Sequence, residues 1–187
     1  MSRIALKTLA PVALLIAAAF VSQAQAATQV VTFNVLNASA TLPTPFLAGD
    51  TLRLDTLVTT QVGTLLQTVT FTVGAGVGSF SGQGAWEIST AAGPGPRLVG
   101  VNLDVFDATN TLVASDSFAG TLAGFALSSF VSTPIGPGTY RLVASGTGVR
   151  DSSLDVTLSF APVPEPGSVA LMLAGLGVVG FMARRRR

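Results

Sequence analysis

Three prolines at every second position, 162, 164 and 166, divide the sequence into two parts that must fold differently. Each proline fixes its own φ angle and favours extended geometry in the residue before it, so this segment forms neither a helix nor a central strand. Residues 167–183 carry no charge and would span about 25 Å as a helix, near the lower limit for crossing a bilayer. Arg184, Arg185, Arg186 and Arg187 follow, and the positive-inside rule assigns them to the cytoplasm as a stop-transfer signal. We therefore expect a transmembrane helix over residues 168–183, a cytoplasmic Arg cluster at 184–187, and the preceding chain outside the inner membrane.

This order of segments resembles the PEP-CTERM sorting signal of Gram-negative bacteria. The similarity rests on Val163, Pro164, Glu165 and Pro166, on the apolar core 171–177 and on the terminal arginines. In that family a membrane protease-transpeptidase, the exosortase, recognises the tail and is described as cutting near the Pro-Glu-Pro motif. The resemblance implies a protein that is anchored before processing and then released to the cell surface or to a biofilm matrix rich in exopolysaccharide. Our first hypothesis is that this protein is non-enzymatic and has no cofactor. A plain C-terminal anchor that is never cut is the alternative.

The glycines of the apolar span also satisfy the pattern G-x-G-x-x-G, at Gly175, Gly177 and Gly180. A dinucleotide-binding fingerprint needs a preceding strand, a βαβ unit and an acidic residue about twenty positions later. The sequence ends seven residues after Gly180. We interpret these glycines as the small residues that are common in membrane helices.

Residues 1–26 predict a secretory signal peptide. Arg3 and Lys7 precede an apolar run that extends to Val21, and Ala24 and Ala26 form an A-x-A cleavage site. We expect cleavage after Ala26 and export through the inner membrane. The chain contains no Cys, which excludes a lipoprotein anchor, a disulfide framework and thiol chemistry.

One domain is expected over residues 27–160, followed by a linker at 161–167 that carries the sorting motif. Between the two processed ends lie four arginines and eight acidic residues, a net charge of −4. Nucleic acid is therefore not an expected partner. The expected partners are the exosortase, the inner membrane before processing, and polysaccharide or further copies of the same chain.

Apolar and polar residues alternate with a period of two throughout this domain, which predicts strands with one buried and one wet face. The clearest example is 153–160, where Leu154, Val156, Leu158 and Phe160 alternate with polar residues. The expected strands are 28–36, 51–59, 68–73, 99–105, 111–118, 122–130, 139–145 and 153–160. Turn signals are expected at 74–78, 82–84, 92–96, 107–110, 134–138 and 146–148. The pattern predicts an antiparallel β-sandwich, and the stretch 137–143 resembles a strand of jelly-roll-like bacterial domains.

One PEP-CTERM subgroup is described by an F-x-D-x-F pattern in an early strand. Leu65, Gln67 and Val69 stand at the corresponding positions here. The apolar-polar-apolar rhythm is kept, but none of the three named residues is.

An enzyme or lectin is the second function that we consider, because a glycosidase needs only two carboxylates. Glu87 beside the only tryptophan, Trp86, is the first candidate for a sugar site. Strand alternation predicts instead that Trp86 fills the core and that Glu87 points to water.

Two further patterns suggest ligands. Oxygen atoms of Asp104, Asp107, Asn110 and Asp116 could hold Ca²⁺, although Asp-x-x-Asn is also ordinary turn composition. The row Thr68, Thr70 and Thr72 could face ice, although any half-exposed strand favours β-branched residues.

Overall fold

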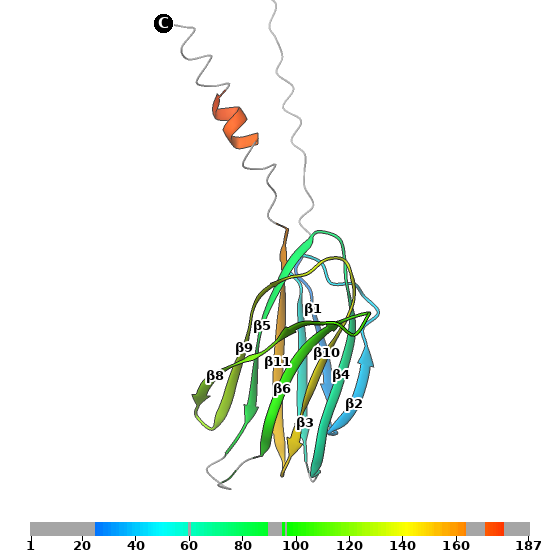
Figure 1. Cartoon of the computed structure of the whole chain (residues 1–187), viewed down its shortest axis with the longest axis vertical. Helices are drawn as coiled ribbons and strands as arrows, with labels where there is room; N and C mark the ends of the chain where they lie inside the picture. The colour runs from blue at the N-terminus through cyan, green and yellow to red at the C-terminus, as the bar shows by residue number, and fades with distance from the viewer. Residues whose placement is uncertain (1–24, 60, 90–94, 96, 164–170, 178–187) are drawn as a thin grey trace, which may run out of the picture.

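The computed structural model describes residues 25–59, 61–89, 95, 97–163 and 171–177. Within these ranges eleven strands form two sheets that pack face to face, and residues 171–177 are helical (Figure 1). This confirms the predicted all-β, sandwich-like fold. The predicted transmembrane helix at 168–183 lies partly outside the described residues, and no helix in the described part of the chain has the length and hydropathy needed to cross a bilayer. That helix therefore stays a prediction.

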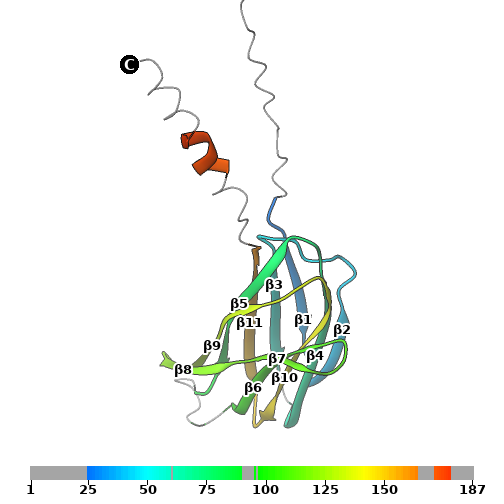
Figure 2. The same ribbon diagram turned by 45° about the horizontal axis from the view of Figure 1, so that its top comes forward.

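The two sheets contain six and five strands, and Figure 2 shows how they lie against each other. In spatial order, the six-stranded sheet contains β1 (Thr28–Phe33), β3 (Thr51–Val58), β11 (Ser152–Pro162), β5 (Val77–Glu87), β9 (Phe125–Pro134) and β8 (Ser117–Leu122). The five-stranded sheet contains β2 (Asn37–Thr41), β4 (Gly63–Val73), β10 (Gly138–Gly148), β6 (Leu98–Asp107) and β7 (Leu112–Ser115).

The sequence pattern predicts an antiparallel sandwich, but two of the strand pairs are parallel. β1 pairs with β3, and β2 with β4, in parallel, whereas the other strand pairs are antiparallel. The reason is that β1 and β2 are consecutive but belong to different sheets. Three residues, 34–36, carry the chain across one edge of the sandwich between them.

A second sheet switch corrects the predicted strand 111–118. This segment splits at Asp116 into β7 and β8, which are edge strands of different sheets. Asp116 is fixed at the crossing by Leu103, because the Leu103 N–H donates to Asp116 Oδ1 over 2.9 Å and the Asp116 N–H donates to the Leu103 carbonyl oxygen over 2.9 Å.

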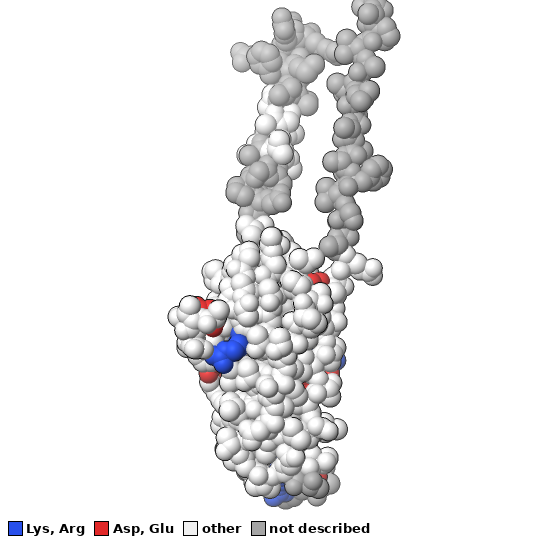
Figure 3. All heavy atoms as spheres, turned by 90° about the vertical axis from the view of Figure 1, so that its right-hand side faces the viewer, with Lys and Arg blue, Asp and Glu red and all other residues white. Residues whose placement is uncertain are grey.

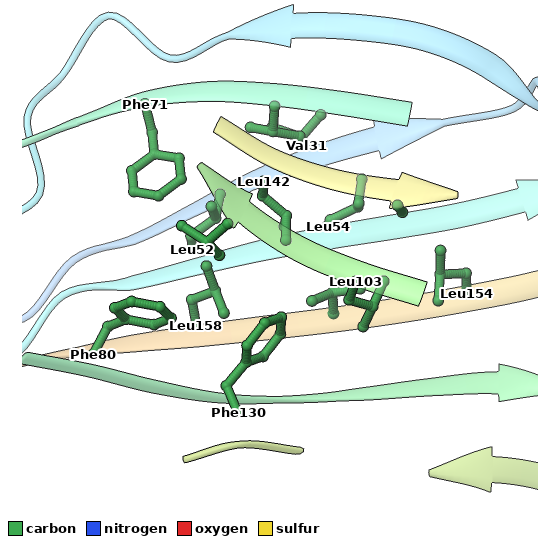
Figure 4. Close-up of a cluster of buried hydrophobic side chains, with 14 of the residues drawn as sticks. Val31, Leu52, Leu54, Phe71, Phe80, Leu103, Phe130, Leu142, Leu154 and Leu158 are labelled. Atoms are coloured by element: carbon green, nitrogen blue, oxygen red, sulfur yellow. The ribbon is translucent and has the colours of Figure 1, made fainter. Parts of the chain in front are cut away.

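The core lies between the sheets and is built by the predicted alternation (Figure 4). In β11, every second residue from Leu154 to Phe160 is at most 2% exposed. The predicted core residues are all buried: Val69, Phe71, Leu103, Val105, Leu142, Leu154, Val156 and Leu158. Burial of each such side chain stabilises the fold by about 1.5–3 kcal/mol.

The turn expected at 82–84 is wrong, because these residues belong to β5. Gly82 and Gly84 lie in the middle of this strand, where neighbouring side chains approach the backbone closely. A Cβ on Gly82 would lie 2.6 Å from Leu158 Cδ2, and one on Gly84 would lie 2.9 Å from Ser128 Oγ. These glycines mark close packing inside a sheet.

The predicted turn 146–148 is also wrong, because these residues belong to β10. An irregularity between Ser145 and Thr147 shifts the register with β6. As a result Leu98 points inward, and Val99, which was expected on the buried face, is 45% exposed. Such a bulge places an extra residue in one strand and changes which side chains face the core.

Candidate functional site

The sorting motif begins where the last strand ends. β11 pairs with β5 as far as Pro162, which lies opposite Val77, with an irregularity after Ala161. The Val163 N–H still donates to the Gly76 carbonyl oxygen over 3.0 Å. Val163 is therefore held against the sandwich, and the motif follows the folded domain without a spacer. Pro164, Glu165, Pro166 and the four arginines lie outside the described residues.

The first described residues lie at the same end of the sandwich as the end of β11. The Thr51 N–H donates to the Ala27 carbonyl oxygen over 2.8 Å, at the start of the β1–β3 ladder. The residue before Thr51, Asp50, is bound to β11, because the Phe160 N–H donates to the Asp50 carbonyl oxygen over 3.0 Å. Figure 1 shows β1 beginning and β11 ending at the same end of the domain. The predicted signal cleavage site after Ala26 and the start of the sorting motif at Val163 therefore lie at the same end of the domain.

Aromatic side chains fill the interior at this end. Phe46 comes from the loop between β2 and β3 and stacks on Phe160, with ring centroids 4.7 Å apart. Phe71 of β4 packs against both rings, at 5.9 Å from Phe46 and 5.8 Å from Phe160. The packing fixes the end of β11 close to the start of the motif.

The signal cleavage site is described in part. Ala26 is exposed, and Ala24 lies outside the described residues. Cleavage after Ala26 thus stays a prediction, at a peptide bond beside the exposed Ala26.

The structure separates the two residues of the predicted sugar site. Trp86 points into the core and is 6% exposed, as strand alternation predicts. Glu87 lies on the other face of β5, where its Oε1 is 3.5 Å from Arg97 Nε. Both charged side chains are only 16% exposed, so Glu87 is paired rather than pointing to water. A site formed jointly by the indole and this carboxylate is not present.

The oxygen atoms considered for Ca²⁺ are not brought together. Asp107 Oδ1 accepts hydrogen bonds from Thr109 and from the Thr111 N–H, which hold the β6–β7 turn. The hydrogen bond from the Thr109 side chain and that from the Thr111 backbone lower the pKa of the Asp107 carboxyl. Elsewhere, Asn110 binds Arg141, Asp104 binds Asn102 and Asp116 binds Leu103. Within the described ranges, no group of three or more His, Cys, Asp or Glu side chains is arranged to hold a metal ion.

The threonine row lies on the outer face of the five-stranded sheet. Thr68, Thr70 and Thr72 are half-buried on β4. Val143 and Arg141 of β10 stand directly beside Thr68 and Thr70. Figure 3, which looks at the side of the molecule where β2 and β4 lie, shows few charged side chains on this surface.

A hollow that the sequence did not indicate lies on the outer face of the six-stranded sheet. Its volume is about 460 Å³. It is lined by the central strands and by β8, through residues that include Arg53, Gln83, Ala119, Ser129, Asp155 and Thr157. A neighbouring hollow of about 300 Å³ continues along β5 and β11 to Ser81 and Ser159. The residues come from four or more strands, and a single-strand pattern carries no signal for such a surface.

Arg53 is the positively charged side chain of the hollow, and it binds two carboxylates. Its Nε donates to Asp55 Oδ1 over 2.7 Å, and its Nη2 donates to Asp155 Oδ2 over 3.1 Å. The hydrogen bond and charge of Asp155, followed by those of Asp55, raise the pKa of the Arg53 guanidinium. Burial raises the pKa of the Asp55 carboxyl, and Asp155 adds to this effect against the opposing influence of Arg53. One cation thus stands between two carboxylates in a surface that is otherwise neutral.

Comparison with known proteins finds a sorting motif and several similar chains among the solved structures. The pre-peptidase C-terminal domain of a collagenase from Bacillus anthracis is 11% identical to the chain, with a TM-score of 0.37, and the comparison covers 71% of this chain and 94% of that one. No curated protein sequence matches the chain. Residues 162–187 match the PEP-CTERM protein-sorting motif, which implies export, an exosortase as processing partner and a membrane-anchored tail before processing. The chain therefore carries a PEP-CTERM protein-sorting motif that starts at the last residue of its final strand.

Proposed function

We propose that this chain is a non-enzymatic protein of the cell surface or the extracellular matrix. It is exported, held in the inner membrane by its tail, and then cut by an exosortase at the motif Val163 to Pro166. Its place after processing is an exopolysaccharide-rich biofilm matrix, where it contacts polysaccharide or further copies of itself.

The observation that carries this proposal is the position of the motif relative to the folded domain. The motif starts at the end of β11, and the domain starts at the same end, beside Asp50. A signal peptide enters the membrane with its N-terminus inside, and a tail ending in arginines has its C-terminus inside. Both membrane segments then need to leave the domain toward one membrane. A sandwich with both ends together meets this requirement without spanning the bilayer.

Contacts with further copies are supported by an apolar edge. β8 is an edge strand of the six-stranded sheet, and its Phe118 and Leu122 are 67% and 66% exposed. Val131 on the neighbouring β9 is 75% exposed. Exposed apolar side chains on an edge strand favour association with another chain.

The test compares the intact mass of the protein from a host with an exosortase and from a matched deletion strain. We expect a product without residues 171–187 in the first strain and with them in the second. Glu165→Ala should reduce cutting and leave membrane insertion unchanged, and deletion of Arg184 to Arg187 should disturb orientation. A product that keeps residues 181–187 in both strains would leave only the plain-anchor alternative.

Carbohydrate binding is the second candidate function, and the hollow on the six-stranded sheet favours it. Gln83, Ser129 and Thr157 offer amide and hydroxyl groups that can both donate and accept, and Arg53 and Asp155 add charged partners. Ala85 and Leu127 provide apolar surface within the same hollow. Sugars present hydroxyl groups around apolar C–H faces, so this combination suits a polysaccharide segment.

This candidate is tested by measuring the affinity of the exported protein for exopolysaccharide from the producing organism. Gln83→Ala combined with Ser129→Ala should weaken binding by about tenfold or more, because each lost hydrogen bond contributes about 0.5–1.5 kcal/mol. Ser39→Ala combined with Thr70→Ala changes the opposite sheet and serves as the control. Equal loss in both pairs, or in neither, would exclude the hollow as the binding site.

A further inference from the structure

We propose that Asp50 is the binding site for the new α-ammonium group that forms at Ala27 when the signal peptide is cut. This proposal rests on the export and cleavage that are part of the proposed function. It adds a role for processing: the cut converts the start of β1 into the cationic partner of a buried carboxylate.

The Asp50 carboxylate already contacts the atom that would become the new terminus. The Ala27 nitrogen donates to Asp50 Oδ1 over 2.7 Å, and the Leu47 N–H donates to Oδ2 over 2.7 Å. Asp50 is only 6% exposed. Its side chain is therefore directed at Ala27 and is largely removed from water.

The position of this carboxylate is fixed by the backbone around it. The Asp50 N–H donates to the Leu47 carbonyl oxygen over 3.1 Å, which closes a turn with Gly49 at a φ of 96°. The Asp50 carbonyl oxygen accepts the Phe160 N–H, and the Gly49 N–H donates to the Phe160 carbonyl oxygen over 2.8 Å. The turn thus connects β3 to β11. The carboxylate already has this position in the uncut chain.

The charge of Asp50 has no cationic partner among the described residues. The ion pairs in this part of the chain join Arg53 to Asp55 and Asp155, and Arg97 to Glu87. A buried carboxylate that is met only by neutral N–H donors keeps part of its desolvation cost. A charge-assisted hydrogen bond is shorter and roughly twice as strong as a neutral one.

Cleavage after Ala26 supplies the missing cation without moving the chain. The Ala27 nitrogen changes from an amide N–H to an –NH₃⁺ group at the same position, 2.7 Å from the carboxylate in the uncut chain. The Ala27 carbonyl oxygen meanwhile accepts the Thr51 N–H, next to the first β1–β3 pair, Thr28 and Thr51. The ion pair would therefore anchor the edge strand β1 in the processed protein.

The α-amino group of Ala27 can be labelled selectively, because the processed chain has no lysine. Lys7 is the only lysine in the chain, and it lies in the signal peptide. In the processed protein the α-amino group of Ala27 is then the only primary amine. An amine-reactive acetylating reagent reports on this one group, with the product measured by intact mass.

The experiment uses the exported, full chain after signal cleavage, whose first residue is established by N-terminal sequencing. The neutral amine is the reactive form, and a carboxylate beside it favours the ammonium form, so acetylation should be at least about tenfold slower in the folded protein than in urea. Asp50→Asn should restore the rate of an exposed terminus. Asp104→Asn, which changes a carboxylate on β6, should leave the protection unchanged.

A second variant covers the case in which Asp50→Asn does not fold. A serine inserted between Ala26 and Ala27 moves the new amine one residue away and keeps Asp50 intact. This amine should react at the unprotected rate in a chain that is still folded. A first residue other than Ala27 in the original chain would overturn both the cleavage prediction and the docking. A first residue of Ala27 with an unprotected amine would overturn the docking alone and leave export standing.

Discussion

The Thr56 hydroxyl donates a hydrogen bond to Gln67 Oε1 over 2.7 Å and thereby joins the two sheets inside the core. Thr56 lies on β3 and Gln67 on β4, and they are 4% and 0% exposed. Gln67 Nε2 in turn donates to the Val35 carbonyl oxygen over 2.8 Å. Gln67 therefore also holds the segment 34–36, in which the chain crosses from one sheet to the other.

Gln67→Ala should destabilise the domain by about 2–4 kcal/mol, because it leaves a cavity and two unpaired polar groups. Gln83→Ala on the outer face of β5 is the matched control and should change stability by less than about 0.5 kcal/mol. Urea unfolding followed by the fluorescence of buried Trp86 measures both. Similar effects of the two substitutions would contradict the bridging role of Gln67.

Gly82→Ala should destabilise the domain at strand β5. The new Cβ would clash with the Thr157 carbonyl oxygen and would lie 2.6 Å from Leu158 Cδ2. Since a backbone atom is involved, we expect a loss of about 1–3 kcal/mol or more. Gly136→Ala is the control, because a Cβ there meets nothing within 4 Å. A tolerated Gly82→Ala would mean that β5 and β11 can separate at this point.

The fold class and most of the core could be predicted from alternation alone. In β11, Leu154 to Phe160 present a strict period of two, and one face of the strand is buried as expected. The same rule failed at Val99, since an extra residue in β6, between Val99 and Asn102, changed the register with β10. Sheet switching at residues 34–36 and at Asp116 was not predictable either, because a strand pattern does not state which sheet a strand joins.

Of the candidate sites, one could be predicted from the sequence and one could not. The sorting motif was predicted because its chemistry lies in consecutive residues, and the match at 162–187 confirms it. The hollow around Arg53 and Asp155 was missed, because these residues are far apart in the sequence and meet only through the β3–β11 pairing. Its polar residues look like the ordinary wet face of several separate strands.

The two faces of β11 should respond in opposite ways to a new charge. Val156 is fully buried, so Val156→Asp should prevent folding or cost more than about 3 kcal/mol. Thr157 lies on the outer face opposite Arg53 of β3, and Thr157→Asp should change stability by less than about 1 kcal/mol. Urea unfolding of both variants checks this. Equal damage would contradict the one-sided burial of the strand.

Asp107 should make the stability of the β6–β7 turn depend on pH. Its pKa is lowered in the folded state by the hydrogen bonds from Thr109 and Thr111, relative to an ordinary value of 3.8. The ionised carboxylate therefore stabilises the fold above that value, and this contribution is lost as pH falls through the lowered pKa. Asp107→Ala should be less stable than the parent at neutral pH, and the difference should shrink in acid. A difference that stays constant with pH would contradict this role of the carboxylate.

Four residues, Gly-Ser-Gly-Ser, inserted between Pro162 and Val163 should increase the rate of tail processing and leave the motif Val163 to Pro166 whole. A protease that holds its substrate as an open strand needs extended residues on the N-terminal side of the motif. Those residues belong to β11 as far as Pro162, and the Val163 N–H is bound to Gly76. We therefore expect that the end of the ladder opens before cutting in the native chain, and that the insertion removes this requirement.

The same four residues inserted after Gly136, in the turn between β9 and β10, serve as the control and should leave processing unchanged. Pulse-chase labelling in a host with an exosortase gives both rates from the shift in mass. If the two insertions gave equal rates, the end of β11 would not limit access to the motif. A slower rate for the insertion at Val163 would show that the enzyme needs the motif close to the folded domain.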